Sequence, residues 1–140
     1  MVRQEWNKEL IAYRLHRAHE TLIDAEILLK SERWNTCVNR LYYACFYAVS
    51  ALLSTKGLSS SKHSGIRSLF NRNFVKTGLV SRGLATIYND LFERRQESDY
   101  ADFVDFIEAQ VMPWYSKAEL CLFRSNRPPV PNHSVHPFRR

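Results

Sequence analysis

The sequence of 140 residues is poor in the residues that break regular structure or cross-link it. Its four glycines and five prolines are too few for a collagen-like chain, a turn-rich sandwich or a glycine-rich phosphate loop. Its three cysteines have no paired spacing, which fits a reducing compartment and no disulfide framework. Since 45% of the residues are hydrophobic and 24% charged, the composition indicates one globular domain rather than a disordered chain.

Acidic residues are absent from a long internal stretch. No Asp or Glu lies between Glu32 and Asp90, whereas eight Lys and Arg fall there. Residues 90–119 carry eight acidic and three basic residues, and residues 120–140 carry four arginines and no acid. The net charge of +6 therefore divides into +4 for this last segment and +2 for residues 1–119. Two interpretations stay open: an anion-binding face, or mutual compensation of the charged blocks on folding.

No segment has the character of a targeting signal or a membrane span. The N-terminal residues contain no apolar stretch before a cleavage site, which argues against a secretory signal. The longest apolar run, residues 42–53, is interrupted by Ser50 and is too short to cross a bilayer. The sequence therefore predicts a cytoplasmic protein without a membrane partner.

Hydrophobic periodicity predicts an amphipathic helix over residues 5–29. Leu15, Ala18 and Leu22 recur at spacings of three and four and are expected to face the core. Arg14 and Arg17 fall on the opposite, polar side. The second helix, residues 34–56, is apolar on nearly every side, so it must be either the central helix of a bundle or partly a subunit interface.

Three further helices are expected, at residues 63–74, 82–97 and 108–124. Ser81 is a good N-cap for the second of these, and Pro113 is placed in the first turn of the last. No strand is expected, so the predicted fold class is all-α, with a helical domain over residues 1–125. Residues 126–140 are expected to form an extended, basic, proline-rich tail.

The sequence offers no strong metal site, cofactor site or nucleophile. His16, His19 and Glu20 can approach one another on the first helix, but they share a polar face and lack a fourth ligand. His133 and His136 form an equally weak pair in the tail. The three cysteines fit structural roles: Cys45 lies in an apolar stripe, Cys121 lies in the last helix, and Cys37 has no His or Lys at helical spacing. We therefore expect neither a metal nor a cofactor.

The end of the fourth helix holds a more specific set of residues. Arg95 and Asp99 are four residues apart, which favours a helical ion pair. Together with Tyr100 they also make a guanidinium, a carboxylate and a phenol that could hold a phosphate or orient a ribose.

Three segments carry a family resemblance that covers about residues 8–125. They are Val38-Asn-Arg-Leu-Tyr-Tyr-Ala-Cys-Phe-Tyr-Ala-Val in the second helix, Lys62-His-Ser-Gly-Ile at the start of the third and Arg95-Gln-Glu-Ser-Asp-Tyr at the end of the fourth. In this order and spacing, the chain resembles the HEPN superfamily of small all-helical domains. It is most similar to single-domain bacterial and archaeal members, many encoded beside minimal nucleotidyltransferases in toxin–antitoxin-like pairs. The resemblance implies a five-helix bundle (a four-helix up-and-down core plus a short helix), a homodimer and a nucleotidyltransferase partner.

Many HEPN proteins are metal-independent endoribonucleases, with a motif that pairs an arginine with a histidine a few residues further on. Here no histidine follows Arg94 or Arg95 until His133. Asp99 occupies the position at which the resemblance would place the motif histidine. An aspartate, with a reference pKa of about 3.9, is ionised at neutral pH, so it cannot donate a proton and it repels phosphate. We therefore expect no ribonuclease activity of the usual HEPN kind.

Three functional hypotheses follow. The first is a non-catalytic binding module that takes up a nucleotide or RNA, or docks a nucleotidyltransferase, through Arg40, Tyr43, Arg94, Arg95, Asp99 and Tyr100. The alternative is an endoribonuclease with a variant site, drawn from Arg95, Asp99, Tyr100 and His63. His63 opens a helix whose dipole disfavours the charged imidazole, which suits a neutral base, although a loop or capping role is the simpler expectation. The third is a structural subunit in which Arg95 and Asp99 form an internal ion pair and Tyr43 and Tyr47 form an interface.

Overall fold

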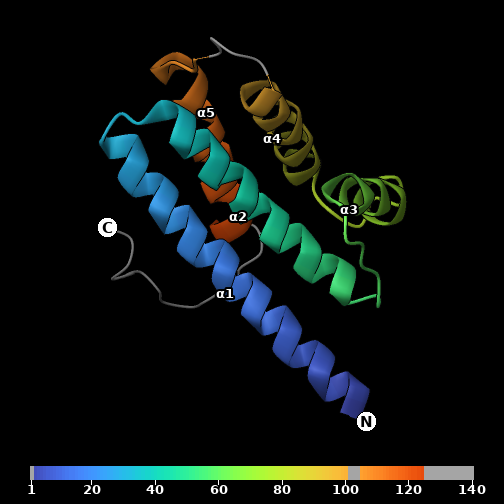
Figure 1. Cartoon of the computed structure of the whole chain (residues 1–140). Helices are drawn as coiled ribbons and strands as arrows, with labels where there is room; N and C mark the ends of the chain where they lie inside the picture. Colours follow the sequence, from blue (N-terminus) through green and yellow to red (C-terminus); the bar gives the residue numbers. More distant parts are fainter. Residues whose placement is uncertain (1, 101–104, 125–140) are drawn as a thin grey trace.

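The computed structural model describes residues 2–100 and 105–124, which contain five α-helices, two of them continued by a short π-helical turn (Figure 1). Among these residues there is no strand, which confirms the all-α prediction. The elements are α1 (Val2–Lys30), α2 (Trp34–Ser54), α3 (His63–Phe70), η1 (Asn71–Val75), α4 (Arg82–Tyr100), α5 (Glu108–Glu119) and η2 (Leu120–Arg124). The predicted tail, residues 126–140, lies outside the described residues.

Helices α1, α2, α4 and α5 run alternately up and down, and α3 is inserted across the connection from α2 to α4 (Figure 1). The predicted four-helix core with an additional short helix is therefore confirmed. Helix α2 contacts α1, α3, α4 and α5, so it is the central helix of the bundle. This arrangement explains its composition, because a helix covered on all sides needs apolar residues on all sides.

The core is built around α2 and receives side chains from every other helix. From α2 itself Leu41, Tyr42 and Leu53 are fully buried, and Leu22 of α1 and Phe70 of α3 pack into the same cluster. Burial of such side chains stabilises the fold by roughly 1.5–3 kcal/mol each. The position of α2 therefore follows from the hydrophobic effect acting on its sequence.

The buried face of α1 differs from the prediction in its N-terminal half. Leu15 is 48% exposed. Arg14 instead reaches α2, where its guanidinium donates to Ser54 Oγ at 2.7 Å, and Arg17 donates to Tyr47 Oη at 3.0 Å. Periodicity counts apolar residues and assigns arginine to solvent, but an arginine stem can lie along a helix interface while its head bonds to polar groups there. Arg14 also lies beside the last turn of α2, where a cation is favoured.

Local signals at the helix ends were mostly correct. Ser81 is the predicted N-cap of α4 and accepts a hydrogen bond from Leu84 N at 3.1 Å. Two boundaries were wrong: α4 continues through Ser98 and Asp99 to Tyr100, and Pro113 lies in the second turn of α5 rather than the first. Helix-propensity differences of about 0.5 kcal/mol are too small to end a helix at Ser and Asp.

The three cysteines are free and buried, as their apolar settings predicted. Burial raises the pKa of the Cys37 thiol to about 11, and it also raises the pKa of Cys45 and of Cys121. No group of three or more metal-ligating side chains occurs among residues for which side chains are described, and His16 only forms a pair with Glu20 at 3.3 Å. None of the described helices combines the length and the apolar character of a membrane-spanning segment.

Candidate anion-binding site

Side chains from three helices meet on one side of α2. Helix α2 contributes aromatic rings at adjacent positions and one turn apart, α3 contributes its first residue, and α4 contributes an arginine from its last third. We call this group the arginine–aromatic cluster: Arg40, Tyr42, Tyr43 and Phe46 of α2, His63 of α3 and Arg95 of α4. Tyr42 is fully buried, whereas the other five members are partly exposed, so solvent and a ligand can reach the cluster.

His63 lies against the aromatic rings of α2. Its ring centroid is 4.4 Å from that of Phe46 and 5.6 Å from that of Tyr43. Its Nδ1 is 3.1 Å from the hydroxyl of Tyr42. The expected capping role is wrong, because Lys62 is the N-cap residue of α3 and the cap has no side-chain hydrogen bond. The imidazole is part of the cluster.

The electrostatic setting keeps both hydrogen-bonding groups neutral at pH 7. Burial, and then the charge of Arg95, lower the pKa of His63. The expected direction was therefore correct, but its main cause is burial rather than the helix dipole. Burial raises the pKa of Tyr42 to about 12, although Arg95 acts against the shift. A protonated Tyr42 hydroxyl can donate to Nδ1 of a neutral His63, which leaves Nε2 as the other hydrogen-bonding atom of that imidazole.

Two guanidinium groups approach the same tyrosine ring. Cζ of Arg95 is 4.7 Å from the ring centroid of Tyr42 and 6.0 Å from that of Tyr43. Cζ of Arg40 is 5.2 Å from the centroid of Tyr43, and its guanidinium donates to Asn39 Oδ1 at 2.9 and 3.2 Å. These cation–π contacts orient the guanidinium groups without consuming their charge.

Of the other predicted site residues, the structure describes the side chain of Arg94, which is not part of this group. Arg94 points toward α5, where its Cζ is 5.9 Å from the ring centroid of Trp114. The side chains of Asp99 and Tyr100 lie outside those that the structure describes. An ion pair between Arg95 and Asp99 therefore stays a prediction.

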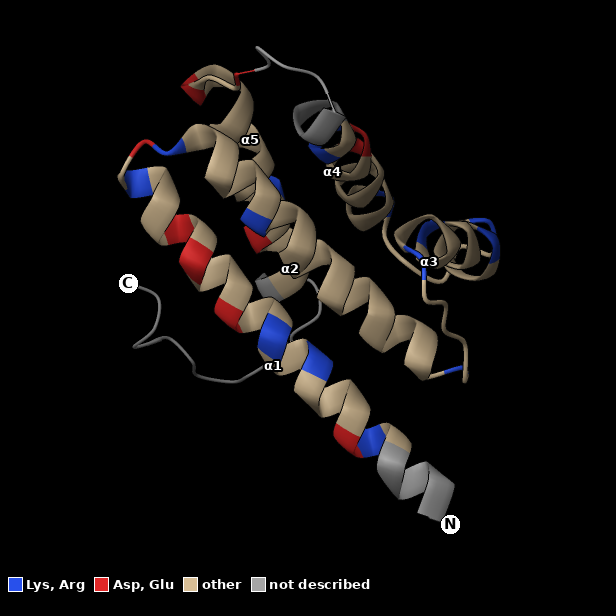
Figure 2. Ribbon diagram, viewed as in Figure 1, with Lys and Arg blue, Asp and Glu red and all other residues tan. Residues whose placement is uncertain are grey.

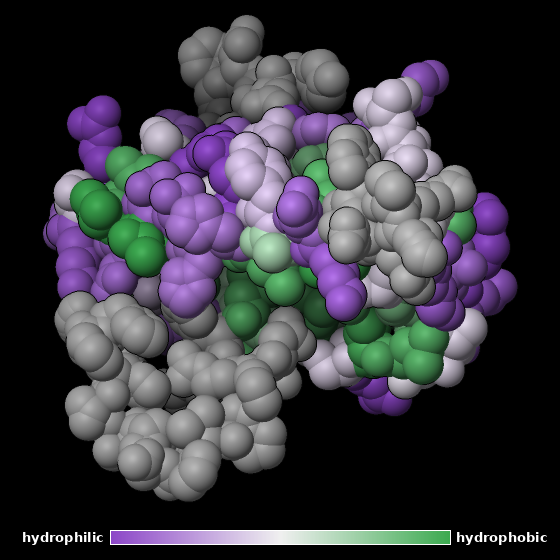
Figure 3. Space-filling view, turned by 90° about the horizontal axis from the view of Figure 1, so that it is seen from below, coloured by the Kyte–Doolittle hydropathy of each residue, from purple (hydrophilic) through white to green (hydrophobic). Residues whose placement is uncertain are grey.

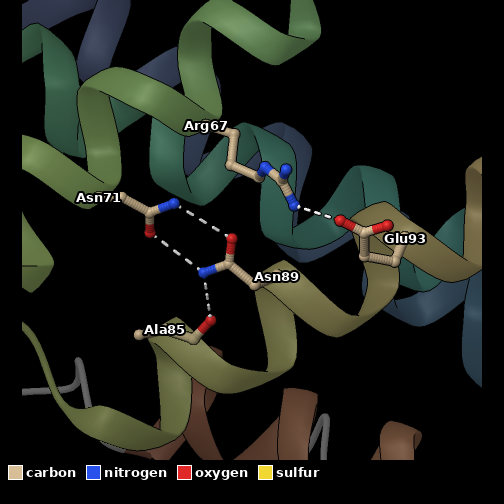
Figure 4. A network of polar contacts seen from close by, with 5 residues as sticks. All are labelled: Arg67, Asn71, Ala85, Asn89 and Glu93. Carbon is tan, nitrogen blue, oxygen red and sulfur yellow. Dashed lines mark hydrogen bonds and ion pairs between the residues drawn. The ribbon is translucent and has the colours of Figure 1, made fainter.

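A polar network holds α3 and its continuation η1 against α4 (Figure 4). The amides of Asn71 and Asn89 donate to each other at 3.2 and 3.1 Å, and Asn89 also donates to Ala85 O at 2.8 Å. Arg67 donates to Glu93 at 2.8 Å, with its Cζ 4.1 Å from the ring centroid of Phe92. Because His63 and Arg95 belong to these two helices, the network fixes the distance between them.

Sequence reasoning missed Tyr42, Phe46 and Arg67 as members or supports of the site. The signal for Arg67 was present, because it follows His63 by four residues and so shares its helix face. Tyr42 and Phe46 looked like ordinary core residues, since their pattern is that of a buried helix.

His63 should make the stability of the fold depend on pH. Its pKa is lowered in the folded state from the value of 6.5 and returns toward that value on unfolding. The unfolded state therefore binds the proton first, and native stability should fall as the pH drops below about 6.5 toward the folded-state pKa. Urea unfolding at pH 7.5 and 5.5 should show a larger loss on acidification for the wild type than for His63→Gln. Equal losses, or an NMR titration midpoint of His63 at or above 6.5, would contradict this.

Comparisons with known proteins agree with this architecture. The sequence profile described as "HEPN domain" matches residues 11–123. The chain is 54% identical to a UPF0332 protein of Thermotoga maritima over 112 residues, which are 80% of this chain and 85% of that protein. It is 37% identical over 86 residues to a Methanocaldococcus jannaschii protein named "Putative toxin MJ0142", covering 61% of this chain and 58% of that protein. A second protein of that organism, "Putative toxin MJ0605", is 33% identical over 93 residues, 66% of this chain and 69% of that protein.

Proposed function

The chain belongs to the HEPN family, and on that premise we propose that it is a binding module for the phosphate groups of a nucleotide or RNA. The binding site is the arginine–aromatic cluster. The setting we propose is a toxin–antitoxin-like system, which the names of the two Methanocaldococcus jannaschii relatives support.

One observation carries the proposal: Arg40 and Arg95, from different helices, lie within about 6 Å of the same partly exposed ring, that of Tyr43. A guanidinium binds phosphate through parallel hydrogen bonds, and an aromatic face accepts a stacked base. His63 adds a neutral hydrogen-bonding group beside them. These are the components that recognition of a nucleotide needs, and they converge although their residues are up to 55 positions apart in the sequence.

Binding should be tested by fluorescence anisotropy with a labelled single-stranded RNA over a range of salt concentrations. The affinity should fall steeply with salt. Arg95→Ala and Arg40→Ala should each weaken binding by about 10- to 100-fold, because each removes charge-assisted hydrogen bonds of roughly 1.5–3 kcal/mol. Lys117→Ala is the matched control, since Lys117 is exposed on α5 and carries the same charge. A flat salt dependence, or equal affinities for all three variants, would contradict the proposal.

A variant endoribonuclease is the second candidate, because His63 and Arg95 both lie against the rings of Tyr42 and Tyr43. Attack by a ribose 2′-hydroxyl needs a base, an acid and a cation. A neutral His63 supplies the base and Arg95 the cation, but the lowered pKa makes His63 a poor source of the proton that the leaving group needs. We therefore expect the same RNA to remain intact. Cleavage that both His63→Ala and Arg95→Ala abolish would favour the enzyme.

The proposal includes a homodimer and a nucleotidyltransferase partner. The argument for a dimer from the apolar α2 no longer applies, since α1, α3, α4 and α5 cover that helix. Support comes instead from the outer face of α1, where Tyr13 and Ile27 are each 59% exposed and Ile23 is 41% exposed. Light scattering on the samples of the binding experiment should give twice the 16.5 kDa chain mass, and a monomer mass would contradict the dimer.

A further inference from the structure

We propose that the outer surface of α3, η1 and the segment before them is a second binding surface, which holds the sugar–phosphate backbone of single-stranded RNA. This inference rests on the proposed function and identifies the ligand as a polynucleotide rather than a free nucleotide. We call it the basic surface and define it by four exposed residues: Lys56, Lys62, Arg72 and Lys76.

All charged side chains of the basic surface are positive. Figure 2 shows Lys and Arg on α3 and its continuation, with no Asp or Glu, because residues 33–89 contain none. Arg67, which faces α4, is neutralised by Glu93, but Lys62, Arg72 and Lys76 form no ion pair with any side chain that the structure describes. Lys56 lies over the ring of Phe74, with Nζ 5.1 Å from its centroid, which directs this cation over η1. The positive charge is therefore available to an outside anion.

The basic surface begins next to the arginine–aromatic cluster along the chain. Lys62 directly precedes His63, the first residue of α3. The approach to α3 is ordered: Lys62 N donates to Ser60 Oγ at 3.2 Å, and Gly65 leaves room for Ser60. A Cβ at position 65 would overlap that hydroxyl and lie 2.9 Å from Ser60 Cβ. A chain with one phosphate at the cluster can therefore continue past Lys62 onto the basic surface.

The size and chemistry of the surface favour RNA over a protein. Residues 63–75 span about 20 Å at a rise of 1.5 Å per residue, which is long enough for several nucleotides. Exposed serines at positions 59, 61 and 64 add hydroxyl donors of the kind that contact phosphate. A protein interface needs an apolar or aromatic centre, whereas Leu79 is the only exposed large hydrophobic side chain that the structure describes between residues 56 and 82. In the view from below, hydrophilic side chains dominate the periphery, and apolar side chains are visible at the left, the centre and the lower right (Figure 3).

The test compares two triple variants with the same change in net charge. One removes three of the four cations of the basic surface (Lys62→Ala, Arg72→Ala and Lys76→Ala), and the control removes three exposed lysines elsewhere (Lys8→Ala, Lys30→Ala and Lys117→Ala). Two probes are titrated into each: a 20-nucleotide single-stranded RNA and AMP. The basic-surface variant should bind the RNA at least roughly tenfold more weakly, and the slope of log K against log salt should fall by about 2, or 0.7 per lost contact. AMP binding should be unchanged in both variants, as should RNA binding in the control.

Each other outcome has a definite meaning. Equal losses in the two triple variants would show a net-charge effect and overturn the inference, as would RNA binding no tighter than AMP binding. Tighter binding of polyglutamate than of RNA would indicate that the surface binds an acidic protein, and this result would also overturn the inference. The proposed function is judged separately by Arg95→Ala, which should weaken AMP and RNA alike. If Arg95→Ala affects neither probe while the basic-surface variant loses RNA, the proposed function fails and the second surface stands. Thermal unfolding checks that the variants are folded, which is expected because the substituted residues are exposed.

Discussion

Replacing Tyr42 with alanine should lower the free energy of unfolding by about 3–5 kcal/mol, the range found for buried aromatic side chains. Tyr42 is fully buried at the point where α2, α3 and α4 meet. Its ring centroid lies 5.0 Å from that of Tyr43 and 6.1 Å from those of Tyr88 and Phe92. The truncation removes these contacts and leaves a cavity that three helices cannot fill by a small shift. Urea unfolding at pH 7.5 measures the effect.

Two further variants separate the causes of that loss. Tyr42→Phe keeps the ring and removes only the hydroxyl that pairs with His63, so it should cost about 1 kcal/mol. Tyr13→Ala removes a tyrosine that is 59% exposed and should change stability by less than about 0.5 kcal/mol. A loss for Tyr42→Ala no larger than that for Tyr42→Phe would show that the ring does not join the three helices.

The second large effect is expected at Leu22, on α1. Leu22 is 1% exposed and belongs to the core cluster, so Leu22→Ala should cost about 2–5 kcal/mol. The matched control is Leu15→Ala on the same helix, because Leu15 is 48% exposed. It should change the free energy of unfolding by less than about 0.5 kcal/mol.

This pair of leucines tests the orientation of α1 directly. Apolar periodicity puts both residues on the inner face, whereas in the structure Arg14 and Arg17 occupy the interface with α2 near Leu15. Similar losses for the two leucine variants would mean that α1 is rotated from the position described. A small loss for Leu22→Ala alone would mean that α1 contributes little to the core.

The sequence predicted those parts of the fold that depend on the composition of a single helix or on residues that are neighbours in the chain. The all-round apolar character of α2 predicted either a central helix or a partial subunit interface, and the structure shows the central helix. Ser81 predicted where α4 begins, since a cap needs only its own neighbours. The inner face of the N-terminal half of α1 was predicted wrongly. It depends on Ser54 and Tyr47, hydrogen-bond acceptors 30 to 40 residues away that periodicity does not include.

The sequence identified residues of the candidate site but did not predict how they are arranged in space. Arg40, Tyr43 and Arg95 were all singled out, and the structure brings them together. His63 was expected to sit at a helix start, which is correct, but its neighbours on α2 follow only from how α3 crosses that helix. The Asn71–Asn89 amide pair, which joins η1 to α4, supports the position of α3 and has no signature in either sequence segment.

The reactivity of the three buried thiols can report local unfolding of the helical bundle. Thiolate is the form that reacts with alkylating reagents, and burial both shields Cys37, Cys45 and Cys121 and raises the pKa of each thiol. A reagent in solution therefore reacts only with molecules in which the surrounding helices have separated. Cys37 and Cys45 lie on the central helix and Cys121 on the last, so their separate labelling rates report how often the two parts of the bundle open.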